Sequence, residues 1–249
     1  MPTIDNYASD AYIRLLLQGS SGSGKTTTAC QFPGAWIIDC DMNLAGPLRY
    51  LREKGLSLPL GYDKVDVKDD GTVVPENLRW QRLCDLIKEI GVKANVIGLK
   101  TIVIDSMSKM NDYNEAHVLR TNPTKTGGME MTSWGFYASN WTKLLAAVTA
   151  AKVNFVLTAH DKIDKDELDG STRVFLNVPG KTQAIAGSLF TDVWHAEVQA
   201  GAGMNATHKF VLRTIQDYRY VGLKNSLMLP PLFEFDWKKI EEKLNPASK

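Results

Sequence analysis

The sequence has few cysteines, almost no net charge and no long hydrophobic run. Its 249 residues include three cysteines, Cys30, Cys40 and Cys84, with no C-x-x-C pair among them. This odd number at wide spacing excludes a disulfide framework and a zinc knuckle, and it is typical of an intracellular protein with buried thiols. No apolar run approaches the ~18–20 residues that span a bilayer, and the first residues lack the basic start and apolar centre of a signal peptide. We therefore expect a cytoplasmic protein without membrane contact.

The charges nearly cancel, since 29 Lys and Arg stand against 28 Asp and Glu, a formal net charge of +1. This balance argues against a protein that coats nucleic acid by bulk electrostatic attraction, although a local basic patch stays open. The hydrophobic content of 44% and the charged content of 23% exclude a disordered, collagen-like or coiled-coil chain. We expect a short polar tail over residues 1–11 and a single core over residues 12–249 that ends in a β-rich extension.

Short apolar runs alternate with helical segments along much of the chain. The predicted strands cover residues 12–18, 35–39, 101–105 and 153–159, and the predicted helices cover residues 25–32, 75–90, 108–120 and 134–152. This alternation predicts an α/β fold, in which a mainly parallel sheet carries helices on both faces. The runs 193–198 and 209–213 predict antiparallel strands at one edge, and Asp169-Gly170 predicts a hairpin turn.

The strongest motif is a phosphate-binding loop between the first strand and the first helix. It matches G-x-x-x-x-G-K-[ST] in full and consists of Gly19, Ser20, Ser21, Gly22, Ser23, Gly24, Lys25 and Thr26, with Thr27 next in the helix. The glycines let successive N–H groups turn toward phosphate oxygens, where the helix dipole also favours anions. Lys25 is expected to reach the β- and γ-phosphates, and Thr26 to ligate Mg²⁺. The sequence therefore predicts a nucleotide site.

Polar residues follow the other predicted parallel strands, at the edge of the sheet where such folds place their chemistry. Asp105 ends the run Ile-Val-Ile-Asp in the Walker B manner and is predicted to complete the Mg²⁺ site with Thr26. Asp39 or Asp41 is expected to orient the water that attacks the γ-phosphate, with capping of the next turn as the alternative. His160 is expected to contact the γ-phosphate, with a simple hydrogen-bonding role as the alternative.

The order of these parts resembles the RecA-type recombinase core, and most of all the small single-domain RecA-like ATPases of bacteriophages that anneal single-stranded DNA. The resemblance covers residues 12–237 and rests on the phosphate loop, on Ile-Asp-Cys-Asp at 38–41, on Val-Ile-Asp-Ser at 103–106 and on Thr-Ala-His at 158–160. It implies a RecA-like P-loop NTPase fold, ATP and Mg²⁺ as cofactors, and an ATPase whose turnover is weak or DNA-dependent. It also implies that Asp41 is the catalytic carboxylate.

The resemblance further implies partners. It places Lys224 where a lysine reaches the nucleotide of the neighbouring subunit, with a solvated lysine as the alternative, and so implies a homo-oligomer, either a ring or a filament. Single-stranded DNA is the expected ligand and a single-strand DNA-binding protein a further possible partner, in a host cell cytoplasm if the protein is viral. The absence of a sizeable N-terminal domain leads us to expect annealing rather than strand exchange.

Two loops are expected to contact DNA by this resemblance. The candidate residues are Arg120, Lys125 and Trp134 in the first loop and Lys162, Lys165 and Arg173 in the second. Cations with an aromatic side chain are what a sequence-tolerant single-strand site needs. The second loop carries five acidic residues and reads as a hairpin, which counts against DNA contact there.

Two alternatives remain open from the sequence. One is a P-loop kinase that passes the γ-phosphate to a small acceptor, although no arginine-rich lid follows the fourth strand. The other is a nucleotide-gated interaction protein whose ATP is structural and which does not bind DNA.

Overall fold

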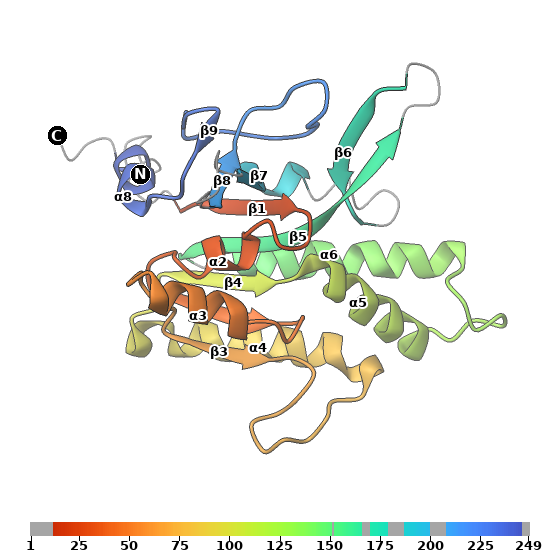
Figure 1. Ribbon diagram of the computed structural model, residues 1–249. Coiled ribbons are helices and arrows are strands. Elements are labelled where there is room, and N and C mark those ends of the chain that lie inside the picture. The colour runs from red at the N-terminus through yellow and green to blue at the C-terminus, as the bar shows by residue number, and fades with distance from the viewer. Residues whose placement is uncertain (1–11, 151, 166–169, 179–186, 200–207, 246–249) are drawn as a thin grey trace, which may run out of the picture.

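The computed structural model describes residues 12–150, 152–165, 170–178, 187–199 and 208–245. The predicted tail at residues 1–11 lies outside the described residues. Within the described part, one mixed sheet runs in the order β3-β2-β4-β5-β1-β7-β8-β9, and β6 pairs with β5 (Figure 1). The strands are β1 (Arg14–Gly19), β2 (Ala35–Asp39), β3 (Gly61–Lys64), β4 (Thr101–Asp105), β5 (Asn154–Lys165), β6 (Thr172–Leu176), β7 (Asp192–Gln199), β8 (Lys209–Arg213) and β9 (Leu232–Phe233).

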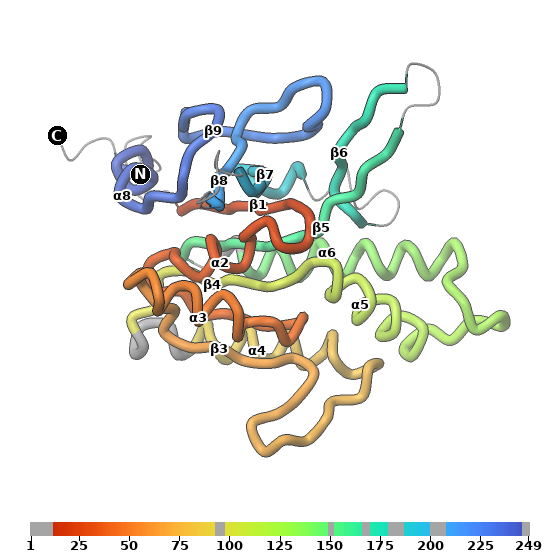
Figure 2. Tube along the Cα trace, in the orientation of Figure 1, coloured from red at the N-terminus to blue at the C-terminus, as the bar shows by residue number. Residues whose placement is uncertain are grey.

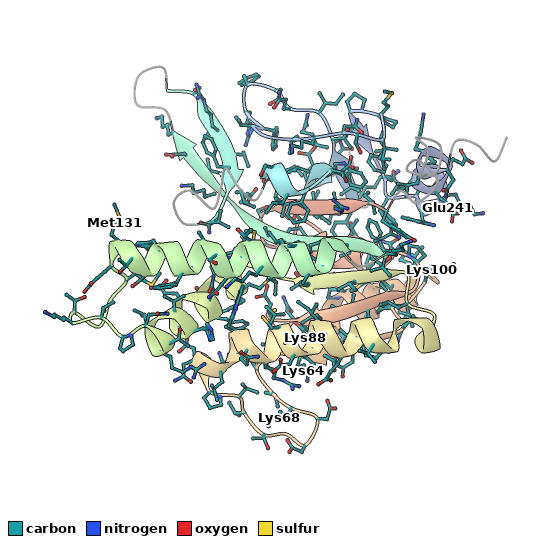
Figure 3. The ribbon with its side chains drawn as sticks, turned by 180° about the vertical axis from the view of Figure 1, so that it is seen from behind. Lys64, Lys68, Lys88, Lys100, Met131 and Glu241 are labelled. Carbon is teal, nitrogen blue, oxygen red and sulfur yellow. The ribbon has the colours of Figure 1, made fainter. Side chains whose placement is uncertain are left out.

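The helices lie on both faces of this sheet, as the sequence predicts. They are α2 (Lys25–Ala29), α3 (Ala45–Glu53), α4 (Glu76–Ile97), α5 (Met107–Thr121), α6 (Met131–Ala150) and α8 (Trp237–Leu244). Seen from behind, α4 and α6 cross one face, with Met131 at the start of α6 (Figure 3). Because side chains alternate along a strand, Leu16 packs with this helix layer, whereas Leu15 and Leu17 pack with residues of α3 and α8 on the other face.

The six strands β3, β2, β4, β5, β1 and β7 are parallel to one another, which confirms the mainly parallel sheet. The prediction for residues 193–198 needs a correction, because β7 is parallel to β1 and antiparallel only to β8. The chain returns to the beginning of β1 before β7 starts, since the Thr191 N–H donates to the Arg14 carbonyl at 3.1 Å. The two strands therefore leave from the same end of the sheet. The antiparallel edge consists of β8 and β9.

Several boundaries differ from the sequence-based prediction. Helix α2 ends at Ala29 rather than at residue 32, and α3, β3, β9 and α8 were not expected. The predicted fourth strand continues to Lys165, because its second half pairs with β6 in the expected hairpin. The tip at residues 166–169, which includes Asp169 of the predicted turn, lies outside the described residues.

Helices α5 and α6 are linked by a largely buried polar ladder. The Tyr137 hydroxyl donates to Asn111 Oδ1 at 2.5 Å, and Asn114 Nδ2 donates to the Tyr137 carbonyl at 2.9 Å. Asn140 Nδ2 donates in turn to Asn114 Oδ1 at 2.8 Å. Since buried polar groups need partners, this ladder fixes the register of the pair. In the part of the chain that the structure describes, no helix is long and apolar enough to cross a membrane.

The packing of α6 on α4 generates a stability prediction. Trp141 is 2% exposed, and its ring meets that of Trp80 edge to face with centroids 5.7 Å apart. We expect Trp141→Ala to lower the free energy of unfolding by about 3–5 kcal/mol, because it removes a large side chain from a packed interface. Tyr218→Ala, at a side chain 82% exposed, is the control and should change it by less than ~0.5 kcal/mol. Urea unfolding measures both, and similar losses in the two variants would contradict the packing argument.

Candidate nucleotide-binding site

The phosphate loop turns sharply between β1 and α2. Gly22 and Gly24 have φ angles of 78° and 87°, a backbone region that glycine enters without strain. A Cβ atom at Gly24 would lie 2.6 Å from Cγ of the Phe210 ring. Two features therefore exclude a side chain at Gly24. The backbone angle is unfavourable for residues with a Cβ atom, and the aromatic ring of Phe210 on β8 occupies the space that the side chain would need.

The Lys25 amino group lies inside the loop rather than in solvent. Lys25 Nζ donates to the carbonyl oxygens of Gly19 at 2.8 Å and Ser20 at 2.7 Å. Burial lowers the pKa of Lys25, while the carboxylates of Asp105, Asp161 and Asp41 oppose that shift. A buried cation held by two carbonyls and faced by carboxylates is available to bind phosphate oxygens.

Asp105 joins three elements at the centre of the site. Thr26 Oγ1 donates to Asp105 Oδ2 at 2.6 Å, and Thr158 Oγ1 of β5 donates to Asp105 Oδ1. Mg²⁺ is usually held by one or two carboxylates, a hydroxyl, waters and phosphate oxygens rather than by an all-protein cage. The adjacent Thr26 hydroxyl and Asp105 carboxylate fit that donor set. Among the described residues, no group of three or more His, Cys, Asp or Glu side chains is placed to hold a metal ion.

The two carboxylates after β2 have different surroundings. Asp39 is 2% exposed, and its Oδ1 accepts the N–H of Asp41 at 3.1 Å. Its carboxylate also accepts from the backbones of Asn43 and Met42. Asp39 thus has the turn-capping geometry that the sequence left open, while Asp41 lines the cavity next to the phosphate loop.

Burial and the nearby Asp105 carboxylate raise the pKa values of both groups after β2. The pKa of Asp39 rises to about 6. The pKa of Asp41 is also raised, against smaller opposing effects of a side-chain hydrogen bond, His160 and Lys109. Two carboxyl groups with raised pKa values beside Asp105 mark this end of the sheet as a candidate functional site.

One cavity of about 490 Å³ gathers the loop and the strand ends. Its lining residues are Ser21, Gly22, Gly24, Lys25, Thr26, Thr27, Asp41, Asn43, Gly46, Pro47, Tyr50, Asp105, Lys109, His160 and Phe210. The sequence-based prediction did not include Lys109 or Phe210. The rings of Tyr50 and Phe210 meet at 5.4 Å between centroids, an apolar wall of the kind that binds a planar base. A volume of this size is ordinary for a small-molecule site.

The remaining predicted residues lie outside this cavity. Lys224 Nζ donates to the carbonyls of Gly187 at 2.5 Å and Phe190 at 3.3 Å in its own chain. Arg120 Nε donates to the Asn77 carbonyl at 3.1 Å. The other residues predicted to bind DNA have exposed side chains. They are Lys125, Trp134, Lys162, Lys165 and Arg173.

The buried acidic centre predicts a pH dependence. Because the pKa of Asp39 rises from 3.8 to about 6, the folded state holds this proton more tightly than the unfolded state. The contribution of Asp39 to stability is therefore full below pH ~4 and is lost as the pH rises toward 6. We expect the difference in unfolding free energy between wild type and Asp39→Asn to fall by up to ~1.4 kcal/mol per pH unit over this window, without Mg²⁺ or nucleotide. Urea unfolding from pH 4 to 8 checks this, and a pH-independent difference would contradict it.

The Lys25 geometry predicts a loss of nucleotide affinity on truncation. Lys25→Ala should raise the Kd for Mg·ATP by about 10- to 150-fold, because charge-assisted hydrogen bonds to the phosphates are removed. Titration with a fluorescent ATP analogue measures the Kd. Lys88→Ala on α4, where the side chain is 73% exposed, is the matched control and should bind as wild type does. Equal affinities in both variants would contradict the assigned position of the phosphates.

Similarity to known proteins is found with one protein family and with solved structures. A family model described as "AAA domain" matches residues 11–223. Among solved structures, the chain is similar to the KaiC-like protein PH0186 of the hyperthermophilic archaeon Pyrococcus horikoshii OT3, at 17% identity over 81% of this chain and 79% of that chain, with a TM-score of 0.43. No curated protein sequence matches it. Because the family model spans most of the chain, including the phosphate loop and Asp105, the protein belongs to the AAA domain family of nucleotide-binding P-loop ATPases.

Proposed function

We propose that the protein is a Mg²⁺-dependent ATPase that binds single-stranded DNA and promotes annealing or recombination, as the bacteriophage ATPases that its sequence resembles do. The proposed ATP hydrolysis is supported by the arrangement of four side chains around one cavity, which is lined by Lys25, Thr26, Asp41 and Asp105. The DNA part of the proposal depends on how this cavity is connected to the surface.

The positions of these cavity residues permit each of them a role in ATP hydrolysis. Thr26 and Asp105 would hold Mg²⁺, which supplies positive charge to the phosphates when bound. Lys25 would leave its two loop carbonyls for the β- and γ-phosphate oxygens. Asp41 would accept a proton from the attacking water, a role helped by a raised pKa. His160 lies on β5, next to the strand that ends at Asp105, and would contact the γ-phosphate of ATP.

The observation that carries the DNA proposal is the continuity of β5. This strand lines the cavity at His160 and continues without interruption to Lys165 in the hairpin with β6. Figure 2 shows the hairpin and the α5–α6 tip projecting on the same side of the molecule, beyond the carboxyl ends of the central strands. A shift of β5 on nucleotide binding would therefore move the hairpin directly.

The described residues of the hairpin, 161–165 and 170–177, hold two acidic and three basic side chains. Asp161 is partly buried, and its Oδ2 lies 2.8 Å from His195 Nε2 of β7. Asp164 faces Arg173 across the β5–β6 ladder, whereas Lys162 and Lys165 are exposed. Together with exposed Lys125 and the 37% exposed Trp134 at the other projection, these side chains offer cations and a stacking ring to a single strand.

The proposal includes a homo-oligomer, ring or filament, in which Lys224 acts on the neighbour's nucleotide. Lys224 is held by its own chain, so this role needs it to exchange the Gly187 carbonyl for a phosphate oxygen. A single-strand DNA-binding protein is the further partner proposed.

Steady-state ATP hydrolysis with and without single-stranded DNA tests the proposal. We expect DNA to stimulate turnover, less so at high salt because phosphate contacts are screened. Asp41→Asn should lower kcat by about 100-fold or more while the Kd for ATP stays within a few-fold. Lys162→Gln with Lys165→Gln should weaken the stimulation, and Lys88→Gln is the matched control.

Other outcomes would identify the alternatives. Turnover indifferent to DNA, with labelled phosphate transferred to a small acceptor, would overturn the proposal in favour of a kinase. If the Asp41→Asn variant loses ATP turnover but keeps the protein's biological function, the protein is a nucleotide-gated interaction protein whose ATP is structural.

A further inference from the structure

A buried phenol lies next to the peptide that carries Asp41, although no reaction step requires a tyrosine. The Tyr113 hydroxyl of α5 lies 2.9 Å from the Cys40 carbonyl oxygen. Tyr113 is 1% exposed, so water does not compete for this contact. The hydroxyl has one proton and lies within hydrogen-bond distance of two acceptors, the Cys40 carbonyl and Asp66 Oδ1, so the carbonyl takes part in a shared hydrogen bond.

The peptide between Cys40 and Asp41 is held on both sides. Its carbonyl faces the Tyr113 hydroxyl, and its N–H donates to Asp39 Oδ1 at 3.1 Å. One residue earlier, the Cys40 N–H donates to the Asp105 carbonyl at 2.6 Å. With the peptide plane held from two directions, the position of the Asp41 Cα atom is fixed, and only rotations about the N–Cα bond and the side-chain bonds can move the carboxylate that lines the cavity.

The phenol is itself held from the opposite side. The Tyr113 hydroxyl also contacts Asp66 Oδ1, and Arg79 Nη1 forms an ion pair with Asp66 Oδ2 at 3.2 Å. The Arg79 guanidinium lies over the Tyr113 ring, 5.7 Å from its centroid. Since Asp66 follows β3 and Arg79 lies on α4, two further elements fix the place of the hydroxyl. Nothing in this group lines the nucleotide cavity.

We infer that Tyr113 is a positioning residue for hydrolysis: through the Cys40 carbonyl it aims the Asp41 carboxylate at the attacking water, and Asp66 and Arg79 keep the phenol in place. The inference rests on the proposed catalytic role of Asp41. Displacement of a reacting group by about 1 Å is enough to slow catalysis by ~100-fold. Loss of this one hydroxyl should therefore affect the rate of hydrolysis much more than ATP binding.

Tyr113→Phe removes the hydroxyl and keeps the ring. We expect kcat in single-turnover hydrolysis to fall by about 10- to 100-fold, while the Kd for Mg·ATP stays within about threefold. The matched control is Tyr137→Phe on α6, another 1% exposed tyrosine, whose hydroxyl donates to Asn111 Oδ1. Both variants should lose a few degrees of Tm, about 2–4 °C, but Tyr137→Phe should keep kcat within about threefold.

A double variant separates positioning from a general loss of stability. If Tyr113 acts through Asp41, then Tyr113→Phe should lower kcat by less than about twofold in the Asp41→Asn background, because the two changes remove the same step. The full 10- to 100-fold loss in that background would overturn the inference, as would equal rates in Tyr113→Phe and Tyr137→Phe. Wild-type turnover in Asp41→Asn, or no turnover in the wild type, would overturn the proposed function instead, and this inference with it.

Discussion

The structure depends most on one buried carboxylate, that of Asp105. It accepts from Thr26 of the phosphate loop and from Thr158 of β5, while its own backbone carbonyl accepts the N–H of Cys40 next to Asp41. Three separate strands and the loop thereby converge on one residue that is 3% exposed. In a low-dielectric interior such charge-assisted hydrogen bonds are strong and directional. The distances among the residues of the site follow from this convergence.

The same convergence brings acidic groups together in the protein interior. Burial, and after it the nearby Asp105 carboxylate, raises the pKa values of Asp39 and Asp41. Lys25 is the cationic side chain that faces Asp105 and Asp41, and burial lowers its pKa. A cation bound beside these carboxyl groups would favour their charged forms, so cation binding and the stability of the fold would be linked through the same side chains.

Local features of the site were predictable from the sequence, and long-range ones were not. The phosphate loop is contiguous in the sequence. Asp41, Asp105 and His160 each follow an apolar run, and because parallel strands end at the same edge of a sheet, the sequence predicts that these residues lie near one another, as they do around the cavity. Phe210 covers the loop from β8, far along the chain, and the exposed edge strand β3 has too few apolar residues to be recognised. The Tyr113 contact with Cys40 joins residues 73 positions apart, which no periodicity shows. The direction of β7 depended on where the chain re-enters the sheet, and local propensity does not determine this.

Helix α5 connects these observations. It begins two residues after Asp105, presents Ser108 Oγ to the N–H of His160 at 3.3 Å, and presents Tyr113 to the peptide before Asp41. Its other end carries Arg120 and leads into the α5–α6 tip (Figure 1). Polar contacts with α6 hold the middle of this helix. Strand β5, through His160, and helix α5, through Lys109, both line the nucleotide cavity, and each leads from it to one of the two projections.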